Sequence, residues 1–338
     1  MPTMSSFSVI CRLRSRRTQR SSTLAHLPRA VTSLASTSGE AAGRGRSLLC
    51  TFTEVSTPGS GSPARSVLDG APETTLESTD IVQVVEYLTY QLLTQYGNNT
   101  EIKTALDKYD FYIVPFVNPD GFVYTQTNNR LWRKNRQTRS GASCVGTDMN
   151  RNWPYKWEVA GGASTNPCDE TYKGAAAGDT PEIKALMAFT NTLTNGKGIK
   201  LFIDWHSYGH YILIPYGYNC AAKAPNHARQ LSLAQGLSTR IAQSYGTRFT
   251  TGQACAALYA TVSLVQRVRA AERIELTGNQ QTGDSTDYLT DVAKAEFAWT
   301  IELRPGSSAS NGFVLPAAQI LPSSIEQWEG LKYLLTNV

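Results

Sequence analysis

Apolar and polar residues follow two different periods along the chain from residue 82 onward. Residues 84–96 are apolar at helical spacing, and Gly97 marks the end of this predicted helix. Residues 111–117 form a continuous apolar run that predicts a buried strand, which ends at the turn residues 118–121. The same patterns predict further helices over residues 181–193, 228–245 and 325–335, and further strands over residues 199–205, 212–214 and 296–302.

Strands that alternate with helices are typical of an α/β fold. We therefore expect a mixed, mostly parallel sheet that is covered by helices on both faces. In sheets of this kind the chemical groups collect at the ends of the strands. His206 and Glu302 each come at the end of a predicted strand, which makes them the first candidates for a functional site.

The first 80 residues do not follow these periods. They are rich in Ser, Thr, Gly, Arg and Pro, a composition that is typical of disorder. We therefore divide the chain into a basic, disordered segment, residues 1–80, and a folded domain, residues 81–338. Residues 262–281 interrupt the folded domain as an atypical insert. Their pattern is compatible with one exposed amphipathic helix, and no residue among them carries chemistry.

The net charge of +5 belongs to the start of the chain. Residues 1–46 contain eight arginines and one acidic residue, and the remaining 24 basic and 26 acidic residues give −2. No aromatic platform or groove-reading motif accompanies these arginines, so we expect no nucleic-acid partner. Their pattern is closer to an organelle transit peptide than to a secretory signal. No apolar run of about 18 residues occurs, so we expect no membrane span.

The cysteines are of two kinds. Two lie in the basic segment, and four lie in the patterned part of the chain: Cys144, Cys168, Cys220 and Cys255. These four lack the close spacing of a zinc finger and suit two disulfides better. Together with one glycosylation sequon at residues 98–100, they favour secretion, whereas the start of the chain does not.

Four segments carry residues with recognisable chemistry. They are residues 118–122 with 129–135, 146–153 with 166–172, 204–208 with 215–217, and 297–304. Each candidate residue taken alone is more commonly a solvated, capping or structural residue. In this order, however, the segments resemble the zinc metallocarboxypeptidases, most closely the secreted carboxypeptidase A-like enzymes of fungi. The resemblance covers residues 84–261 and 282–338.

The resemblance implies a monomeric, secreted enzyme that holds one zinc ion and hydrolyses the C-terminal bond of peptides and proteins. Arg151, helped by Asn150 and Tyr259, matches the group that binds the terminal carboxylate. A guanidinium suits this task because its fork makes two parallel charged hydrogen bonds. Arg133 matches the residue that stabilises the oxyanion on the scissile carbonyl, and Glu302 matches the general base.

Further assignments follow from the same resemblance. His206 matches the third zinc ligand. Three residues match positions that contact the substrate upstream of the cut: Arg130, Ser207 and Tyr208. The resemblance also pairs Cys144 with Cys168 and Cys220 with Cys255, in disulfides that would fasten loops around the site.

The terminal side chain of the substrate enters a pocket whose base Thr286 matches. Ala254, Leu258 and Thr300 match its walls. An uncharged base favours aromatic and aliphatic side chains, because burying an unpaired cation is costly. We therefore expect release of C-terminal Phe, Tyr or Leu. A two-residue shift of the alignment would bring Asp284 inward and favour Lys or Arg instead.

The other two zinc ligands are missing from the sequence. The family takes them from one His-x-x-Glu turn ahead of the helix at residues 84–96, and counting back places this motif on Thr75 and Ser78. A hydrolytic zinc site needs three protein ligands, so we expect the chain as given to be inactive or impaired. The first strands of the family are missing as well. Their loss should expose the core or leave residues 1–80 to cover it.

Three interpretations stay open. In the first, the gene encodes an active zinc carboxypeptidase, and the residues before about 81 reflect translated non-coding or out-of-frame DNA. In the second, the chain is a metal-free pseudoenzyme that binds peptide C-termini through Asn150 and Arg151. In the third, the chain folds poorly and has no function. A His-x-x-Glu motif in another reading frame upstream of the codon for Val84 would support the first.

Overall fold

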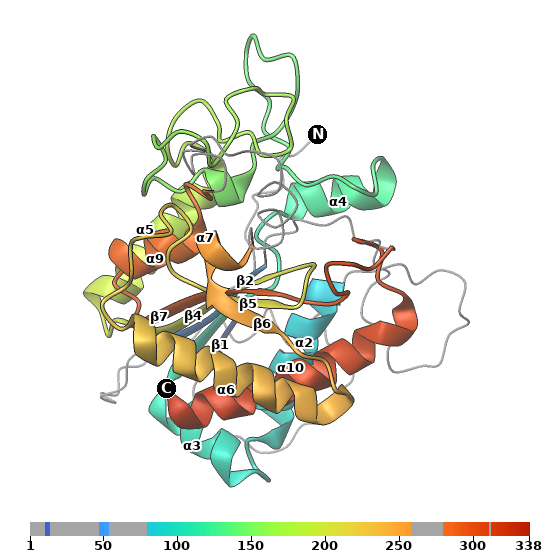
Figure 1. Ribbon diagram of the computed structural model, residues 1–338, viewed down its shortest axis with the longest axis vertical. Coiled ribbons are helices and arrows are strands. Elements are labelled where there is room, and N and C mark those ends of the chain that lie inside the picture. Colours follow the sequence, from blue (N-terminus) through green and yellow to red (C-terminus); the bar gives the residue numbers. More distant parts are fainter. Residues whose placement is uncertain (1–10, 14–46, 54–79, 259–279, 311) are drawn as a thin grey trace, which may run out of the picture.

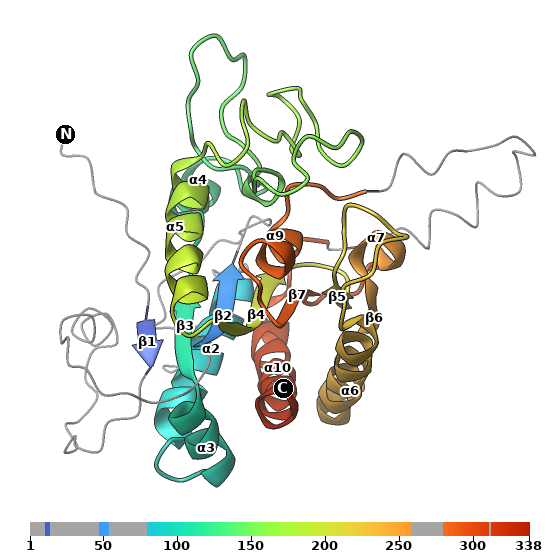
Figure 2. The same cartoon turned by 90° about the vertical axis from the view of Figure 1, so that its left-hand side faces the viewer.

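A computed structural model describes residues 11–13, 47–53, 80–258, 280–310 and 312–338. Seven strands in these ranges form one sheet (Figure 1). Their order across the sheet is β1 (Cys11–Leu13), β3 (Asp110–Val114), β2 (Ser47–Thr53), β4 (Ile199–His206), β7 (Phe297–Glu302), β5 (Tyr211–Ile214) and β6 (Thr250–Gln253). Strand β2 lies between β3 and β4 (Figure 2).

The sheet is mixed and mostly parallel. Strand β2 runs parallel to both β3 and β4, and β4 with β7 and β5 with β6 are also parallel pairs. The pairs β1 with β3 and β5 with β7 are antiparallel. The fold class expected from the alternation of strands and helices is therefore confirmed.

Helices cover both faces of the sheet (Figure 1). One face packs against α2 (Asp80–Gln95), α3 (Thr100–Lys108), α6 (His227–Tyr245) and α10 (Ile320–Asn337) in the larger apolar core. The other face packs against α5 (Pro181–Asn195) and α9 (Ser285–Asp291) in a second core. The remaining helices are α4 (Pro119–Thr127), α7 (Ala254–Ala257) and the short 3-10 turns η2 (Met149–Arg151) and η3 (Ala317–Gln319). No helix in the described ranges is long and apolar enough to cross a bilayer.

Alternation along β4 decides which side chains reach the edge of the sheet near α9. Ile203 and Trp205 belong to the core under α2, α6 and α10, whereas Phe202 belongs to the core under α5 and α9. Because successive strand residues point to opposite faces, Asp204 and His206 lie on the same face as Phe202. The end of β4 thus presents two polar side chains toward α9.

Within the described ranges, every helix and strand predicted from residue 82 onward is present, with shifted ends; the largest shift is in α10, which begins at Ile320. The turn predicted at residues 118–121 is instead the start of α4. There the Asn118 side chain accepts a hydrogen bond from the Gly121 amide at 2.9 Å, and Pro119 follows the cap. Asn and Pro serve both turns and helix starts, which explains this difference.

The structure differs from the expected disorder of residues 1–80 at two places. Strands β1 and β2 both come from this range, and β2 occupies the centre of the sheet. Whether residues 1–80 cover the core, as expected if the family strands are missing, stays a prediction. The division of the chain at residue 80, and the helix expected within residues 262–281, stay predictions, and residues 262–279 lie outside the described ranges.

Candidate active site

His206 and Glu302 end two neighbouring parallel strands. They are directly paired across the β4–β7 register, so their side chains leave the same face of the sheet. The His206 side chain is almost fully buried, at 4% exposure. The two residues that the sequence placed at strand ends are therefore side by side.

A buried hydrogen-bond network orients the His206 ring. Its Nε2 lies 3.0 Å from Asp204 Oδ2, and the same carboxylate oxygen accepts a hydrogen bond from Ser285 Oγ at 2.5 Å. The Asn150 side-chain nitrogen lies 3.2 Å from the same ring nitrogen. Depending on the tautomer, Nε2 donates to Asp204 or accepts from the Asn150 side-chain amide. In the first case the lone pair lies on Nδ1, which is how a carboxylate commonly orients a metal-binding histidine.

The turn η2 holds the two arginines on either side of this network. Its cap residue Asp148 accepts hydrogen bonds from the Asn150 amide at 3.0 Å and from Arg133 Nε at 2.9 Å. The Asn150 side-chain oxygen accepts from the Ser285 amide at 2.9 Å. Arg151 Nη1 donates to the Asn150 carbonyl at 2.7 Å. Because one short turn makes all four contacts, the two guanidinium groups are fixed relative to His206.

Charge converges on Glu302. Burial raises the pKa of this carboxyl group above its ordinary value, and the charge of Asp204 acts in the same direction. The charges of His206, Arg133 and Arg151 lower the pKa and oppose this effect. Charged groups change the pKa of a carboxyl group in this way only when they lie close to it. Residues predicted to act together from four separate segments thus form one electrostatic cluster.

The predicted pocket base lies beside this cluster. Thr286 is buried, and its hydroxyl lies 2.8 Å from the hydroxyl of Thr300 on β7. Asp284, two residues earlier, caps α9 by accepting a hydrogen bond from the Asp287 amide at 2.8 Å. Burial raises the pKa of Asp284 to about 6, and the nearby positive charge of Arg151 opposes that rise.

Two of the predicted substrate contacts lie at the end of β4. Ser207 and Tyr208 directly follow β4, and the Tyr208 ring packs edge-on against Phe313 with 4.7 Å between the ring centroids. Arg130 is half-buried in the segment that follows α4. Tyr259 lies outside the described residues. Its assignment stays a prediction.

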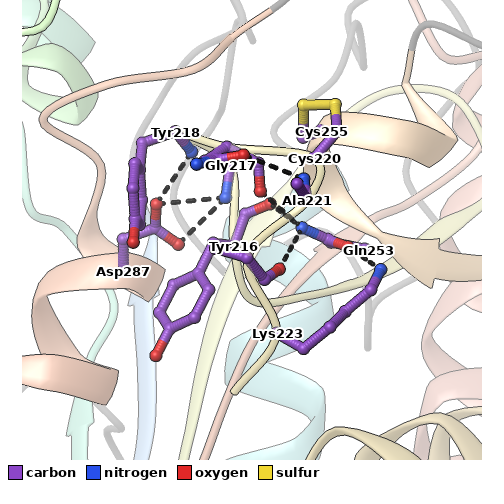
Figure 3. Close-up of a disulfide and its surroundings, with 11 residues drawn as sticks. Tyr216, Gly217, Tyr218, Cys220, Ala221, Lys223, Gln253, Cys255 and Asp287 are labelled. Atoms are coloured by element: carbon purple, nitrogen blue, oxygen red, sulfur yellow. Dashed lines mark hydrogen bonds between the residues drawn. A yellow bond between two sulfur atoms is a disulfide. The ribbon is translucent and has the colours of Figure 1, made fainter.

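Both expected disulfides are present. Cys144 pairs with Cys168, and Cys220 pairs with Cys255. Figure 3 shows the second disulfide near Gln253. The Gln253 side-chain amide donates to the Tyr216 carbonyl, in the loop that contains Cys220. Sequence patterns did not identify Gln253, nor the polar residues that orient the site: Asp148, Asp204 and Ser285. Their neighbours could have pointed to two of these residues. Asp204 is two residues before His206, and Ser285 is immediately before Thr286.

The residues that the structure describes do not fit a zinc site. Within those ranges no group of three His, Cys, Asp or Glu side chains is arranged to hold a metal ion. His206 supplies one imidazole, and a catalytic zinc ion needs three protein ligands. Thr75 and Ser78, where the family motif would fall, lie outside the described residues.

A family model described as zinc carboxypeptidase matches residues 82–330. The chain belongs to this family. It is 43% identical to metallocarboxypeptidase A of Arthroderma otae over 255 residues, which is 75% of this chain and 55% of that protein. It is 35% identical to carboxypeptidase A2 of Mus musculus over 249 residues, which is 73% of this chain and 53% of that protein. The chain therefore spans about half the length of these curated relatives.

Solved structures of carboxypeptidases have the same fold. The crystal structure of thrombin activatable fibrinolysis inhibitor matches with a TM-score of 0.69 and 25% identity, over 89% of this chain and 64% of that chain. Carboxypeptidase A from Helicoverpa armigera matches with a TM-score of 0.61 and 25% identity, over 75% of this chain and 56% of that chain. The recognition of the family from four sequence segments is confirmed.

Proposed function

We propose that this chain carries the recognition half of a carboxypeptidase site and binds the C-terminal residue of peptides and proteins. The observation that supports this most is the position of η2, where Asn150 joins His206 to Ser285 and holds the Arg151 guanidinium beside them. A guanidinium fixed next to a pocket can bind a free carboxylate through two charged hydrogen bonds. Peptide C-termini are the ligands that present such a carboxylate next to a side chain.

Hydrolysis is the step that the chain as given is expected to lack. In the proposed site Arg133 faces the scissile carbonyl and Glu302 is the base, but His206 is the single zinc ligand that the described residues offer. One imidazole does not hold catalytic zinc firmly. We therefore expect purified protein to contain less than one zinc ion per chain and to release no C-terminal amino acid.

A second candidate function is that of an active, secreted zinc carboxypeptidase encoded by the gene with a different front end. It is favoured by the family match, which begins only at residue 82, and by the two disulfides, which suit an oxidising compartment. Genomic DNA upstream of the codon for Val84 tests it. A His-x-x-Glu motif in another frame supports this candidate, and its absence from every frame removes it.

The pocket should prefer aromatic and aliphatic side chains. The Thr286 hydroxyl is bound to Thr300, so the base presents no charge. Asp284 is engaged at one oxygen in capping α9. We therefore propose tighter binding of peptides that end in Phe than of peptides that end in Arg.

Calorimetric titration with two such peptides of otherwise equal sequence tests both proposals at once. Both proposals are supported if the Phe peptide binds and the Arg peptide binds more weakly. Tighter binding of the Arg peptide overturns the assignment of Thr286 while leaving the recognition of C-termini in place. No binding of either peptide overturns the recognition function.

A further inference from the structure

In the proposed pocket, the loop between β5 and α6 is the wall beside Thr286, and α9 holds this loop from one side. Asp287 accepts the amide of Gly217 at 3.0 Å with each of its two oxygens, and it accepts the amide of Tyr218 at 3.0 Å. Because Asp287 directly follows Thr286, these bonds join the loop to the predicted base of the pocket. The position of this wall relative to α9 is thereby set.

Gln253 holds the same loop from the opposite side. This residue ends β6 and is 3% exposed. Its side-chain nitrogen lies within hydrogen-bond distance of three backbone carbonyls: Tyr216 at 3.1 Å, Asn219 at 2.8 Å and Ala222 at 2.9 Å. Its side-chain oxygen accepts a hydrogen bond from Lys223 (Figure 3). One buried amide group therefore gathers three carbonyls of a single loop.

The neighbours of Gln253 belong to the same wall. Ala254, the next residue, is a predicted wall residue of the pocket. The Cys255 amide donates to the Tyr216 carbonyl at 3.2 Å, and the Cys255 side chain forms the disulfide with Cys220. Gln253 thus joins residues 216–222 to α7, the helix that carries the predicted wall residue Ala254.

The carboxylate-binding group is supported by η2 and by a different residue of α9. Arg151 and Asn150 depend on η2 and on Ser285, and none of the hydrogen bonds described for them involves Gln253 or residues 216–222. The parts of the site proposed for the side chain and for the carboxylate thus share α9 as a support, whereas the bonds of Gln253 go to the side-chain part.

We propose that Gln253 is a positioning residue for the side-chain pocket, and that it controls discrimination among C-terminal side chains without controlling recognition of the carboxylate. This inference rests on the proposed function. A peptide ending in Gly reports on the carboxylate alone, because Gly has no side chain to place in the pocket. A peptide ending in Phe reports on both parts, because the ring adds apolar area that only a formed pocket can bury.

The variant Gln253→Glu keeps the shape of the side chain and the acceptor for Lys223. It replaces the donor nitrogen by an oxygen that faces three carbonyls, which removes the attraction and adds repulsion. We expect the preference for the Phe peptide over the Gly peptide, taken as the ratio of the two dissociation constants, to fall by about tenfold. Affinity for the Gly peptide should stay within about twofold.

The variant Gln230→Glu is the matched control. Gln230 lies on α6, is equally buried, and bonds to Asn226 and Trp299 rather than to the wall. It should lower the melting temperature without changing the ratio of dissociation constants. If Gln253→Glu does not fold by circular dichroism, Gln253→Ala replaces it, because Ala removes the donor without adding charge.

Amide hydrogen exchange of the unliganded protein gives an independent reading. In Gln253→Glu, residues 216–222 should exchange about tenfold faster than in the original chain, while β4 and β7 stay unchanged. Unchanged exchange in residues 216–222, or an unchanged ratio of dissociation constants in a folded variant, overturns the role of Gln253. Failure of the original chain to bind either peptide instead overturns the proposed function on which the inference rests.

Discussion

Strand β4 pairs in a regular register with β7 on one side and in a shifted register with β2 on the other. Toward β7 the register runs unbroken through six pairs, and the last of them joins His206 to Glu302. Toward β2 the register shifts twice within the seven residues of β2, and the last pair joins Thr53 to Trp205. The β4–β7 junction is therefore regular up to the site, whereas the β2–β4 junction is irregular near the site.

The two partners of β4 also differ in origin. Strand β7 lies within the family match at residues 82–330, whereas β2 lies outside it. Asn150 and Asp204, which contact His206, and Ser285, which contacts Asp204, belong to the matched part. The comparison teaches that the proposed recognition groups lie beside the regular junction with β7, within the residues that the family model matches.

The largest change in free energy should come from a substitution that disrupts the pairing of β2 with its neighbours. Leu49 pairs with Tyr112 in β3 and with Phe202 in β4, so a proline there removes a donor from a strand that has neighbours on both sides. We expect Leu49→Pro to lower the free energy of unfolding by about 3 kcal/mol. Urea unfolding followed by circular dichroism measures it.

Strand β1 offers the control for this substitution. It pairs with β3 alone, at the edge of the sheet, and edge strands tolerate proline. Leu13→Pro should therefore cost about 1 kcal/mol or less. Equal effects of the two prolines would contradict the central position of β2, and no effect of either would remove the comparison altogether.

A slightly smaller change in free energy should come from a substitution in the proposed recognition group, which lies beside the β4–β7 junction. Arg151→Ala removes the guanidinium that faces the proposed carboxylate, and hydrogen bonds between charged groups are stronger than neutral ones. We expect affinity for a Phe-ending peptide to fall by about 100-fold, as measured by calorimetric titration. Arg240→Ala is the control, because Arg240 on α6 pairs with Glu329 on α10, and both helices belong to the core on the other face of the sheet from α9. A similar loss in both variants would point to general destabilisation.

The smallest effect concerns pH. Burial raises the pKa of Asp284 to about 6, and burial together with the charge of Asp284 raises the pKa of Asp287 well above its ordinary value. The folded chain therefore binds more protons than the unfolded chain between about pH 4 and these raised values. Stability should be greatest below about pH 4 for these groups and should fall as the pH rises through 6, by on the order of 2 kcal/mol.

The variant Asp284→Asn isolates this contribution. Asn keeps a side-chain oxygen that can cap α9, and it removes both the buried charge and its repulsion of Asp287. The decline in unfolding free energy between pH 5 and pH 8 should become shallower in the variant. An unchanged slope would mean that the decline has another origin.

Sequence patterns predicted the longer helices and the buried strands after residue 82 because their periods are regular. They did not predict the shorter elements, namely α3, α4, β6, α7 and α9. They also did not predict β2. Its position depends on pairing with strands that are more than 50 residues away along the chain, and the composition of its surroundings is typical of disorder.

The site divides in the same way. His206, Glu302 and the two arginines were identified because each lies in a recognisable segment. Gln253 was missed because its role depends on three backbone carbonyls of another loop, which no local pattern records. Contacts of side chains with distant backbone are where a structure adds most to a sequence.

The central claim is that this chain recognises a peptide C-terminus without needing a metal ion. Calorimetric titration of the purified chain, with and without EDTA, against one Phe-ending peptide in its free-acid and amidated forms tests it most directly. We predict one binding site for the free acid, the same affinity in EDTA, and at least about 100-fold weaker binding of the amide. Equal binding of acid and amide, or loss of acid binding in EDTA, would contradict the claim.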